Sequence, residues 1–144
     1  MSPYTSSRHM NFKELEISAL FDTTLPRIIL RADIPNFTIL AYNEAYKHAT
    51  YTHHRDITGW YLWEAFNPDK GGDGVNTLFK ALLKAVETNE IVITEPFYYN
   101  IPSVDAGEFT ESWWQLDIVP LKGDGGRPAY LLITTNNLNN RIFA

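Results

Sequence analysis

The chain of 144 residues is 44% hydrophobic and 20% charged, with a formal net charge of −5 at pH 7. This length and composition predict one globular domain with a single core, and they exclude a disordered chain. The acidic balance and scattered basic residues argue against a nucleic-acid partner, and the lack of cysteine excludes disulfides, thiolate metal sites and thiol nucleophiles.

Residues 1–10 have no apolar centre and are interpreted as a flexible leader rather than a signal peptide. The longest apolar runs, such as 129–133, are too short to span a membrane. We therefore expect a cytoplasmic protein without a membrane contact in this chain.

Residues 11–24 predict an N-terminal helix with two apolar edges, because hydrophobic residues recur at helical spacing on both sides. A single domain can cover only one edge, and an uncovered apolar patch usually marks a partner surface. The helix therefore predicts a homodimer, with Phe12, Ile17, Leu20 or Phe21 at the interface.

The hydrophobic period changes to two over residues 27–42, where Pro35-Asn36 supplies a turn, so this segment predicts a β-hairpin. Short helical segments are expected over Asn43–Ala49 and Asp56–Phe66. The Gly-, Pro- and Asp-rich segment 67–74 predicts a loop.

The strongest helical pattern in the chain spans Val75–Val86, where apolar residues recur on one stripe. Asp73 is a candidate N-cap, and Asn89 can end the helix in the left-handed conformation.

Three strands are predicted at the end of the chain, over Ile91–Ile101, Glu111–Leu121 and Pro128–Asn136. A Gly-rich turn over 122–126 joins the last two as a hairpin. The element order predicts an α+β fold, and we expect the hairpin 27–42 to join the strand 128–136.

The sequence contains none of the common catalytic or phosphate-binding motifs, such as a P-loop or a hydrolase elbow. Its histidines (His9, His48, His53 and His54) lack metal-ligand spacing. The acidic residues near 105–111 lie in a predicted loop with no aromatic shield. The sequence therefore predicts neither an enzyme nor a metal site.

From about Leu20 to Asn139 the order of motifs resembles a PAS domain, of the variety found N-terminal to bacterial sensor histidine kinases. The resemblance depends on short motifs in matching order: Asn43-Glu44-Ala45-Tyr46, Asp56-Ile57-Thr58-Gly59, the segments 62–68 and 73–78, Tyr99-Asn100-Ile101-Pro102, Trp114 and Pro120. It implies a PAS-like domain over 25–140, with a five-stranded antiparallel sheet and helices packed on one face.

The resemblance implies a sensory module that binds a small ligand or relays a signal to a histidine kinase-type effector of a two-component system. The flavin-adduct and linked-chromophore varieties need a cysteine that this chain lacks, and the long helix has no histidine for haem. The cofactor is therefore unknown. Asn137-Leu138-Asn139 replaces the family's Asp-x-Thr, which puts its usual output coupling in doubt.

Aromatic residues make up 14% of the chain, which fits either a filled core or a ligand cavity. We expect a cavity between the long helix and the sheet, for a small, flat, mostly apolar ligand. The candidate ligand-binding residues are Tyr46, Trp63, Phe66, Leu82, Phe97, Tyr99, Trp114 and Leu116. The alternatives are an NTF2-like small-molecule-binding or enzyme domain and a ligand-free dimerisation module.

Overall fold

The computed structural model describes residues 17–70, 72–102, 109–110 and 112–139. The predicted leader and Phe12 lie outside the described residues. The elements in chain order are α2 (Ile17–Phe21), β1 (Arg27–Arg31), β2 (Ile39–Tyr42), α3 (Glu44–Thr50), α4 (Leu62–Ala65), η2 (Pro68–Lys70), α5 (Gly74–Thr88), β3 (Val92–Ile93), β4 (Phe97–Tyr98), β5 (Ile101–Pro102), β6 (Phe109–Thr110), β7 (Trp113–Lys122), η3 (Asp124–Gly126) and β8 (Pro128–Asn137).

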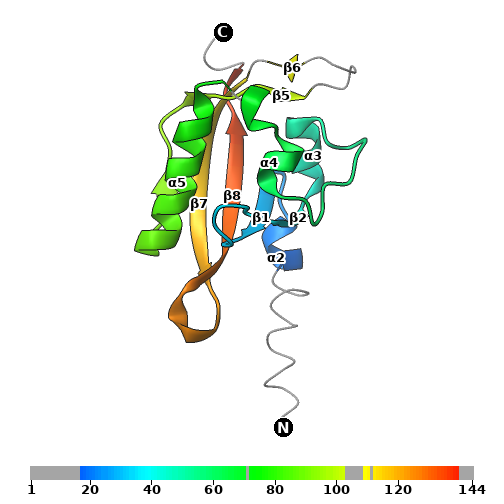
Figure 1. The fold of residues 1–144 in the computed structure, drawn as a ribbon. Coiled ribbons are helices and arrows are strands. Elements are labelled where there is room, and N and C mark those ends of the chain that lie inside the picture. Colours follow the sequence, from blue (N-terminus) through cyan, green and yellow to red (C-terminus); the bar gives the residue numbers. More distant parts are fainter. Residues whose placement is uncertain (1–16, 71, 103–108, 111, 140–144) are drawn as a thin grey trace.

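The main sheet has the strand order β2-β1-β8-β7-β3, with β4 also paired to β7, and all its pairs are antiparallel. The α+β class is confirmed. The predicted position of the first hairpin is also confirmed, because Ile29 of β1 pairs with Leu132 of β8. This pairing brings the two halves of the chain together in the middle of the sheet (Figure 1).

The prediction of one strand over Ile91–Ile101 is wrong, because the edge of the sheet is broken there. Val92 pairs with Ile118, and Phe97 pairs with Trp114. The edge advances by five residues between these pairs while β7 advances by four, so one extra residue bulges out. Pro96 lies in the bulge and has no backbone N–H for the ladder. The main sheet therefore has six strands instead of five, and β5 pairs separately with β6, which was not predicted.

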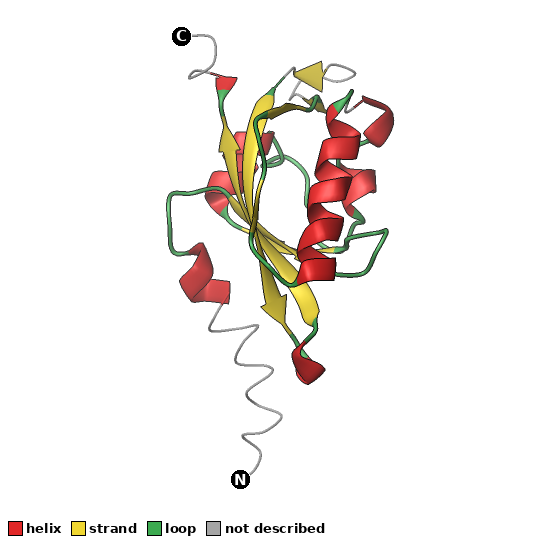
Figure 2. Ribbon diagram, turned by 90° about the vertical axis from the view of Figure 1, so that its left-hand side faces the viewer, coloured by secondary structure: helices red, strands yellow, loops and turns green. Residues whose placement is uncertain are grey.

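Helix α5 packs on one face of the sheet, while α2 lies on the opposite side (Figure 2). The buried stripe of α5 includes Leu78 and Leu82. This stripe packs against the buried, alternating residues Trp114, Leu116 and Ile118 of β7. The predicted periodicities of both elements are confirmed.

The ends of α5 differ from each other in how well the sequence predicted them. Asn89 ends the helix in the left-handed conformation, with φ 54°, as expected. Asp73 occupies the N-cap position, but its side chain makes no capping hydrogen bond, so that part of the prediction is wrong.

Helix α3 begins at a buried cap, because the Asn43 side chain accepts a hydrogen bond from the Tyr46 N–H at 2.9 Å. Only Leu62–Ala65 is α-helical within the predicted helical segment 56–66. Just before it, Tyr61 bridges to Thr38 beside β2, because the backbone there pairs with the sheet instead of coiling.

The second face of the sheet carries its own buried residues. Ile29 and Leu132 are buried but do not belong to the main core cluster. Arg27 ties α2 to the sheet on this side, since its guanidinium donates to the Leu20 carbonyl at 2.7 Å. Within the described part of the chain, no helix has both the length and the apolar character needed to cross a membrane.

Candidate functional site

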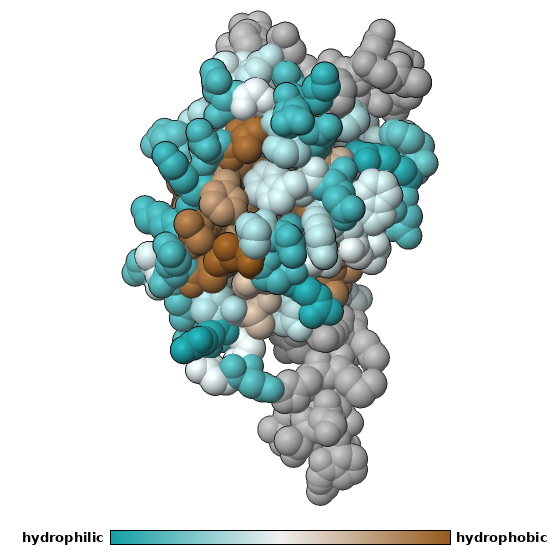
Figure 3. Space-filling model, in the orientation of Figure 1, coloured by the Kyte–Doolittle hydropathy of each residue, from teal (hydrophilic) through white to brown (hydrophobic). Residues whose placement is uncertain are grey.

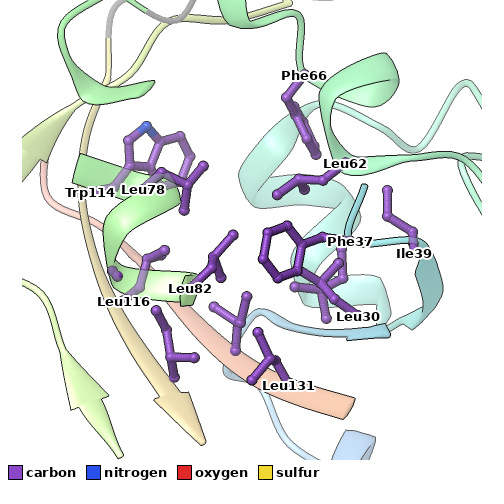
Figure 4. Packing of buried hydrophobic residues seen from close by; sticks show 14 of the residues in the cluster. Leu30, Phe37, Ile39, Leu62, Phe66, Leu78, Leu82, Trp114, Leu116 and Leu131 are labelled. Carbon is purple, nitrogen blue, oxygen red and sulfur yellow. The ribbon is translucent and has the colours of Figure 1, made fainter. Parts of the chain in front are cut away.

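A cavity of about 60 Å³ lies inside the domain, bounded by α3, α4, the start of α5 and the inward face of the sheet. Figure 4 shows the separation that defines it: Trp114 and Leu78 lie on one side, and Phe66 and Leu62 on the other. The walls are almost entirely apolar, and none of the lining residues is charged.

Six of the eight candidate ligand-binding residues line this one cavity: Tyr46, Phe66, Phe97, Tyr99, Trp114 and Leu116. They come from four separate parts of the chain, so the fold brings together residues that are up to 70 positions apart. This convergence is the geometric basis of the candidate site.

Leu82 and Trp63 do not line the cavity, so the fold does not bring these two candidate residues together with the other six. Leu82 is fully buried one turn further along α5, where it lies between Leu116 and Phe37 and fills the core (Figure 4). Trp63 turns outward: its indole N–H donates to the Pro35 carbonyl at 2.7 Å, and its ring contacts Phe79.

Several residues that line the cavity are not among the eight candidates, namely Ile28, Thr50, Leu62, Leu78, Ile101, Ile133 and Thr135. Leu78 could have been predicted from the sequence, because it precedes Leu82 by four residues on the same helical stripe. Thr50 and Thr135 carried no such signal, since a threonine in a polar-looking segment gives no indication of which face it occupies.

Burial raises the pKa of Tyr46 and of Tyr99 above the ordinary phenol value, which already lies well above neutral pH, so both hydroxyls are protonated. The Tyr99 hydroxyl donates to the Phe66 carbonyl at 3.0 Å. Among the described residues the Tyr46 hydroxyl has no hydrogen-bond partner. It is therefore one polar group that the cavity can offer to a ligand, and the hydroxyl of the lining residue Thr135 is another.

Other polar side chains of this region are already paired or lie elsewhere. The Trp114 indole N–H donates to the Tyr99 carbonyl at 3.0 Å, so it is not free for a ligand. Gln115 alternates with the inward residues of β7 and does not line the cavity. The cavity can thus hold a small uncharged molecule through apolar contact and one hydrogen bond.

The size of the cavity sets a limit on its occupant. A buried apolar cavity of about 150 Å³ is known to bind benzene. The present cavity is about 60 Å³, less than half of that, so even a single aromatic ring would need the lining side chains to move.

His48, His53 and His54 gather outside this cavity. The His48 and His53 rings stack with centroids 5.6 Å apart, and His53 meets His54 edge-on. Across the described residues, no group of three or more potential metal-ligating side chains occurs.

Comparison with known proteins identifies the fold. No family model matches the sequence, and no curated protein matches it. Among solved structures, an RNA-binding light-oxygen-voltage receptor superposes with a TM-score of 0.66 at 14% identity, over 93% of this chain and 34% of the receptor. The chain thus spans about a third of that receptor.

Two bacterial structures match in the same way. A PAS domain from Colwellia psychrerythraea has a TM-score of 0.63 at 12% identity, over 90% of this chain and 99% of that domain. The LOV domain of the blue-light-activated histidine kinase from Erythrobacter litoralis has a TM-score of 0.56 at 15% identity, over 79% of this chain and 95% of that domain. At these identities the likeness is one of fold.

Proposed function

We propose that this chain, which has a PAS-type fold, is a non-enzymatic signal-sensing module that holds a small uncharged ligand in its central cavity. The observation that carries the proposal is the apolar cavity itself, with six converging lining residues that were selected from the sequence. A fold alone would not support this function, because function depends on the site that a fold carries.

The chemistry of the lining narrows the class of ligand. Aromatic and aliphatic walls favour an apolar body, and the unpaired Tyr46 hydroxyl favours one hydrogen-bonding group. Since no lining residue is charged, burial of an ionic ligand would be uncompensated. A single substituted ring such as phenol matches this chemistry, and the lining side chains would have to move apart to admit it, because the cavity is only about 60 Å³.

Phenol at a hundredfold excess over its Kd is expected to raise the free energy of unfolding by about 2.7 kcal/mol. Leu116→Phe narrows the cavity wall and should remove this gain. Leu82→Phe adds the same volume outside the cavity, so the gain should remain. Chemical denaturation with and without phenol measures both, and native mass spectrometry of the purified protein tests for a ligand already bound.

Two results would contradict the cavity proposal. One is the absence of any co-purified molecule together with no stabilisation by phenol or benzene. The other is an equal phenol effect in wild type and Leu116→Phe, which would place binding elsewhere.

We further propose that the module passes its signal to an effector of the histidine kinase type, which is the context of the matched Erythrobacter litoralis domain. Hydrogen bonds at the C-terminal end of β8 support this proposal, because they hold the end of the strand firmly against β7. The Leu138 N–H donates to the Trp113 carbonyl at 2.8 Å, and the Asn139 side chain accepts from the Trp113 N–H at 2.8 Å. Asn137-Leu138-Asn139 therefore fixes the last strand to β7 by hydrogen bonds of its own.

A homodimer through the N-terminal helix is the remaining proposal. Ile17, Leu20 and Phe21 stay partly exposed on α2, which leaves apolar surface available for a second copy. Leu20→Asp is expected to shift sedimentation toward the monomer, while Ser18→Asp, on the exposed side of the same helix, should not. A wild-type protein that sediments as a monomer at high concentration would contradict the dimer, and identical behaviour of both variants would contradict this interface.

A further inference from the structure

A second hollow opens on the surface beside edge strand β2, between that strand, α3 and the segment 52–58. Its volume of about 530 Å³ lies within the usual range for small-molecule sites. Its lining differs sharply from that of the central cavity, because it includes Tyr42, Lys47, His53, Arg55 and Asp56. We call this hollow the β2 groove.

Basic residues are concentrated around the β2 groove, although the whole chain has a net charge of −5. Lys47, His48, His53, His54 and Arg55 fall within nine consecutive positions. Lys47, His53 and Arg55 line the groove directly, and the lysine and the arginine supply its positive charge. A local excess of cations on an acidic protein attracts anions to that place.

Lys47 is engaged in the described structure only by an exposed ion pair and a contact with the Tyr42 ring. Its ammonium lies 2.8 Å from Glu44, whose side chain is 74% exposed. Exposed ion pairs of this kind contribute little, so an incoming anion can compete for the ammonium.

Arg55 is the strongest candidate in the β2 groove for binding an anion. Its guanidinium lies 5.8 Å from the Trp60 ring and 5.9 Å from the Phe66 ring, and burial lowers its pKa. It donates to the Ala65 carbonyl at 2.8 Å, but no carboxylate among the described residues forms an ion pair with it. A partly dehydrated guanidinium with unused N–H groups is suited to bind a planar or tetrahedral anion through two hydrogen bonds.

The Asp56 carboxylate limits how much negative charge a ligand in the groove can carry. Its carboxylate accepts from the Tyr42 hydroxyl and from the Thr58 N–H, both at 3.0 Å, so it is held in place at the groove. These hydrogen bonds lower its pKa, which keeps it negative. The groove thus presents two cations and one fixed anion, which favours a small ligand with a single anionic group.

We propose that the β2 groove binds the phosphate or carboxylate group of a small molecule, held by Arg55 and Lys47. This site is separate from the central cavity, and its existence does not depend on the ligand proposed there.

The experiment titrates inorganic phosphate, and separately acetate, against the protein at constant ionic strength with chloride as the balancing salt, followed by two-dimensional NMR. We expect saturable shifts at residues of the groove for at least one of the two anions. Lys47→Gln should raise the Kd about fivefold to tenfold, since one charge-assisted contact is lost. Asp56→Asn should lower the Kd, because it removes the like charge.

Lys84→Gln is the matched control, because it makes the same charge change on an exposed position of α5, away from α3 (Figure 1). It should leave the Kd unchanged. Arg55→Lys keeps the charge but loses the two-pronged geometry, so it should weaken binding while the spectrum confirms the fold. Leu116→Phe in the central cavity should have no effect on anion binding.

The proposal is overturned if neither anion gives saturable shifts, or if Lys84→Gln weakens binding as much as Lys47→Gln. Tighter binding by Asp56→Asn supports it, and weaker binding by that variant counts against it.

Discussion

Replacing Gly74 with alanine is expected to lower the free energy of unfolding by about 3 kcal/mol, at the upper end of the cost of overpacking. Gly74 is buried at the start of α5, directly against β4. An alanine Cβ there would lie 1.8 Å from the Tyr98 carbonyl oxygen and 3.1 Å from the Phe97 ring. The nearest atom belongs to backbone, so no side-chain rotation can relieve the overlap, and α5 must move away from the sheet.

Gly125→Ala is a suitable control for this substitution. Gly125 has a positive φ of 83° and nothing within 4 Å of an added Cβ, so alanine there costs only the conformational strain of about 1–2 kcal/mol. Urea denaturation of both variants separates crowding from strain. A Gly74→Ala protein within 1 kcal/mol of wild type would mean that α5 is not fixed against β4.

Asn43→Ala should be nearly as damaging, with an expected loss of about 3 kcal/mol. The Asn43 side chain accepts from the Tyr46 N–H and the Arg27 N–H, and it donates to the Leu25 carbonyl, all at 2.9 to 3.0 Å. Loss of a helix cap costs about 1 kcal/mol, and each buried group left unpaired adds about 1–3 kcal/mol. One side chain thus fixes the start of α3 and the start of β1 together.

Asn43→Asp tests this account, because the carboxylate keeps both acceptor contacts and loses only the donor to Leu25. Its stability should fall between those of wild type and Asn43→Ala. Asn76→Ala makes the same chemical change at an exposed position of α5 and should stay within about 0.5 kcal/mol of wild type. A loss below 1 kcal/mol in Asn43→Ala would contradict the role of the side-chain hydrogen bonds.

The parts of the fold that sequence predicted well are those where one physical pattern dominates. Trp114, Leu116 and Ile118 alternate on a strand with one buried face, and the period of two identifies them directly. Leu78 and Leu82 follow the helical period on α5 in the same way. The candidate aromatic residues converge because these two patterned faces meet.

The errors occurred where tertiary context overrides a local pattern. The segment 91–101 reads as one apolar strand, but the bulge at Pro96 depends on its pairing with β7. Trp63 is a large aromatic residue of the type that lines cavities, yet its indole N–H donates to the Pro35 carbonyl and its ring lies away from the cavity. Figure 3 shows apolar side chains gathered on the surface beside α5, within a largely hydrophilic face.

The β2 groove illustrates a third kind of limit. Its two cations, Lys47 and Arg55, lie eight residues apart in the sequence, but whether they are available to a ligand depends on which carboxylates face them in space. Asp56 directly follows Arg55 in the chain, yet its carboxylate pairs with Tyr42 and Thr58 and forms no ion pair with Arg55. Only the folded arrangement reveals this lack of a partner.

The broken edge of the sheet and the bridge beside β2 together influence how copies of this protein meet. An open strand edge is a template on which another chain can add a strand, and long regular edges lead to fibrous aggregation. On one side, the Trp60 carbonyl accepts from the Ile39 N–H and the Gly59 N–H donates to the Ile39 carbonyl, both at 2.8 Å, which occupies the start of β2. On the other side, β3 is only two residues long before the bulge. The exposed Ile93 of β3 therefore does not belong to a long open edge on which the strand of another copy could add. The irregularities that make these strands hard to predict from the sequence thus also disfavour polymerisation through the sheet edges.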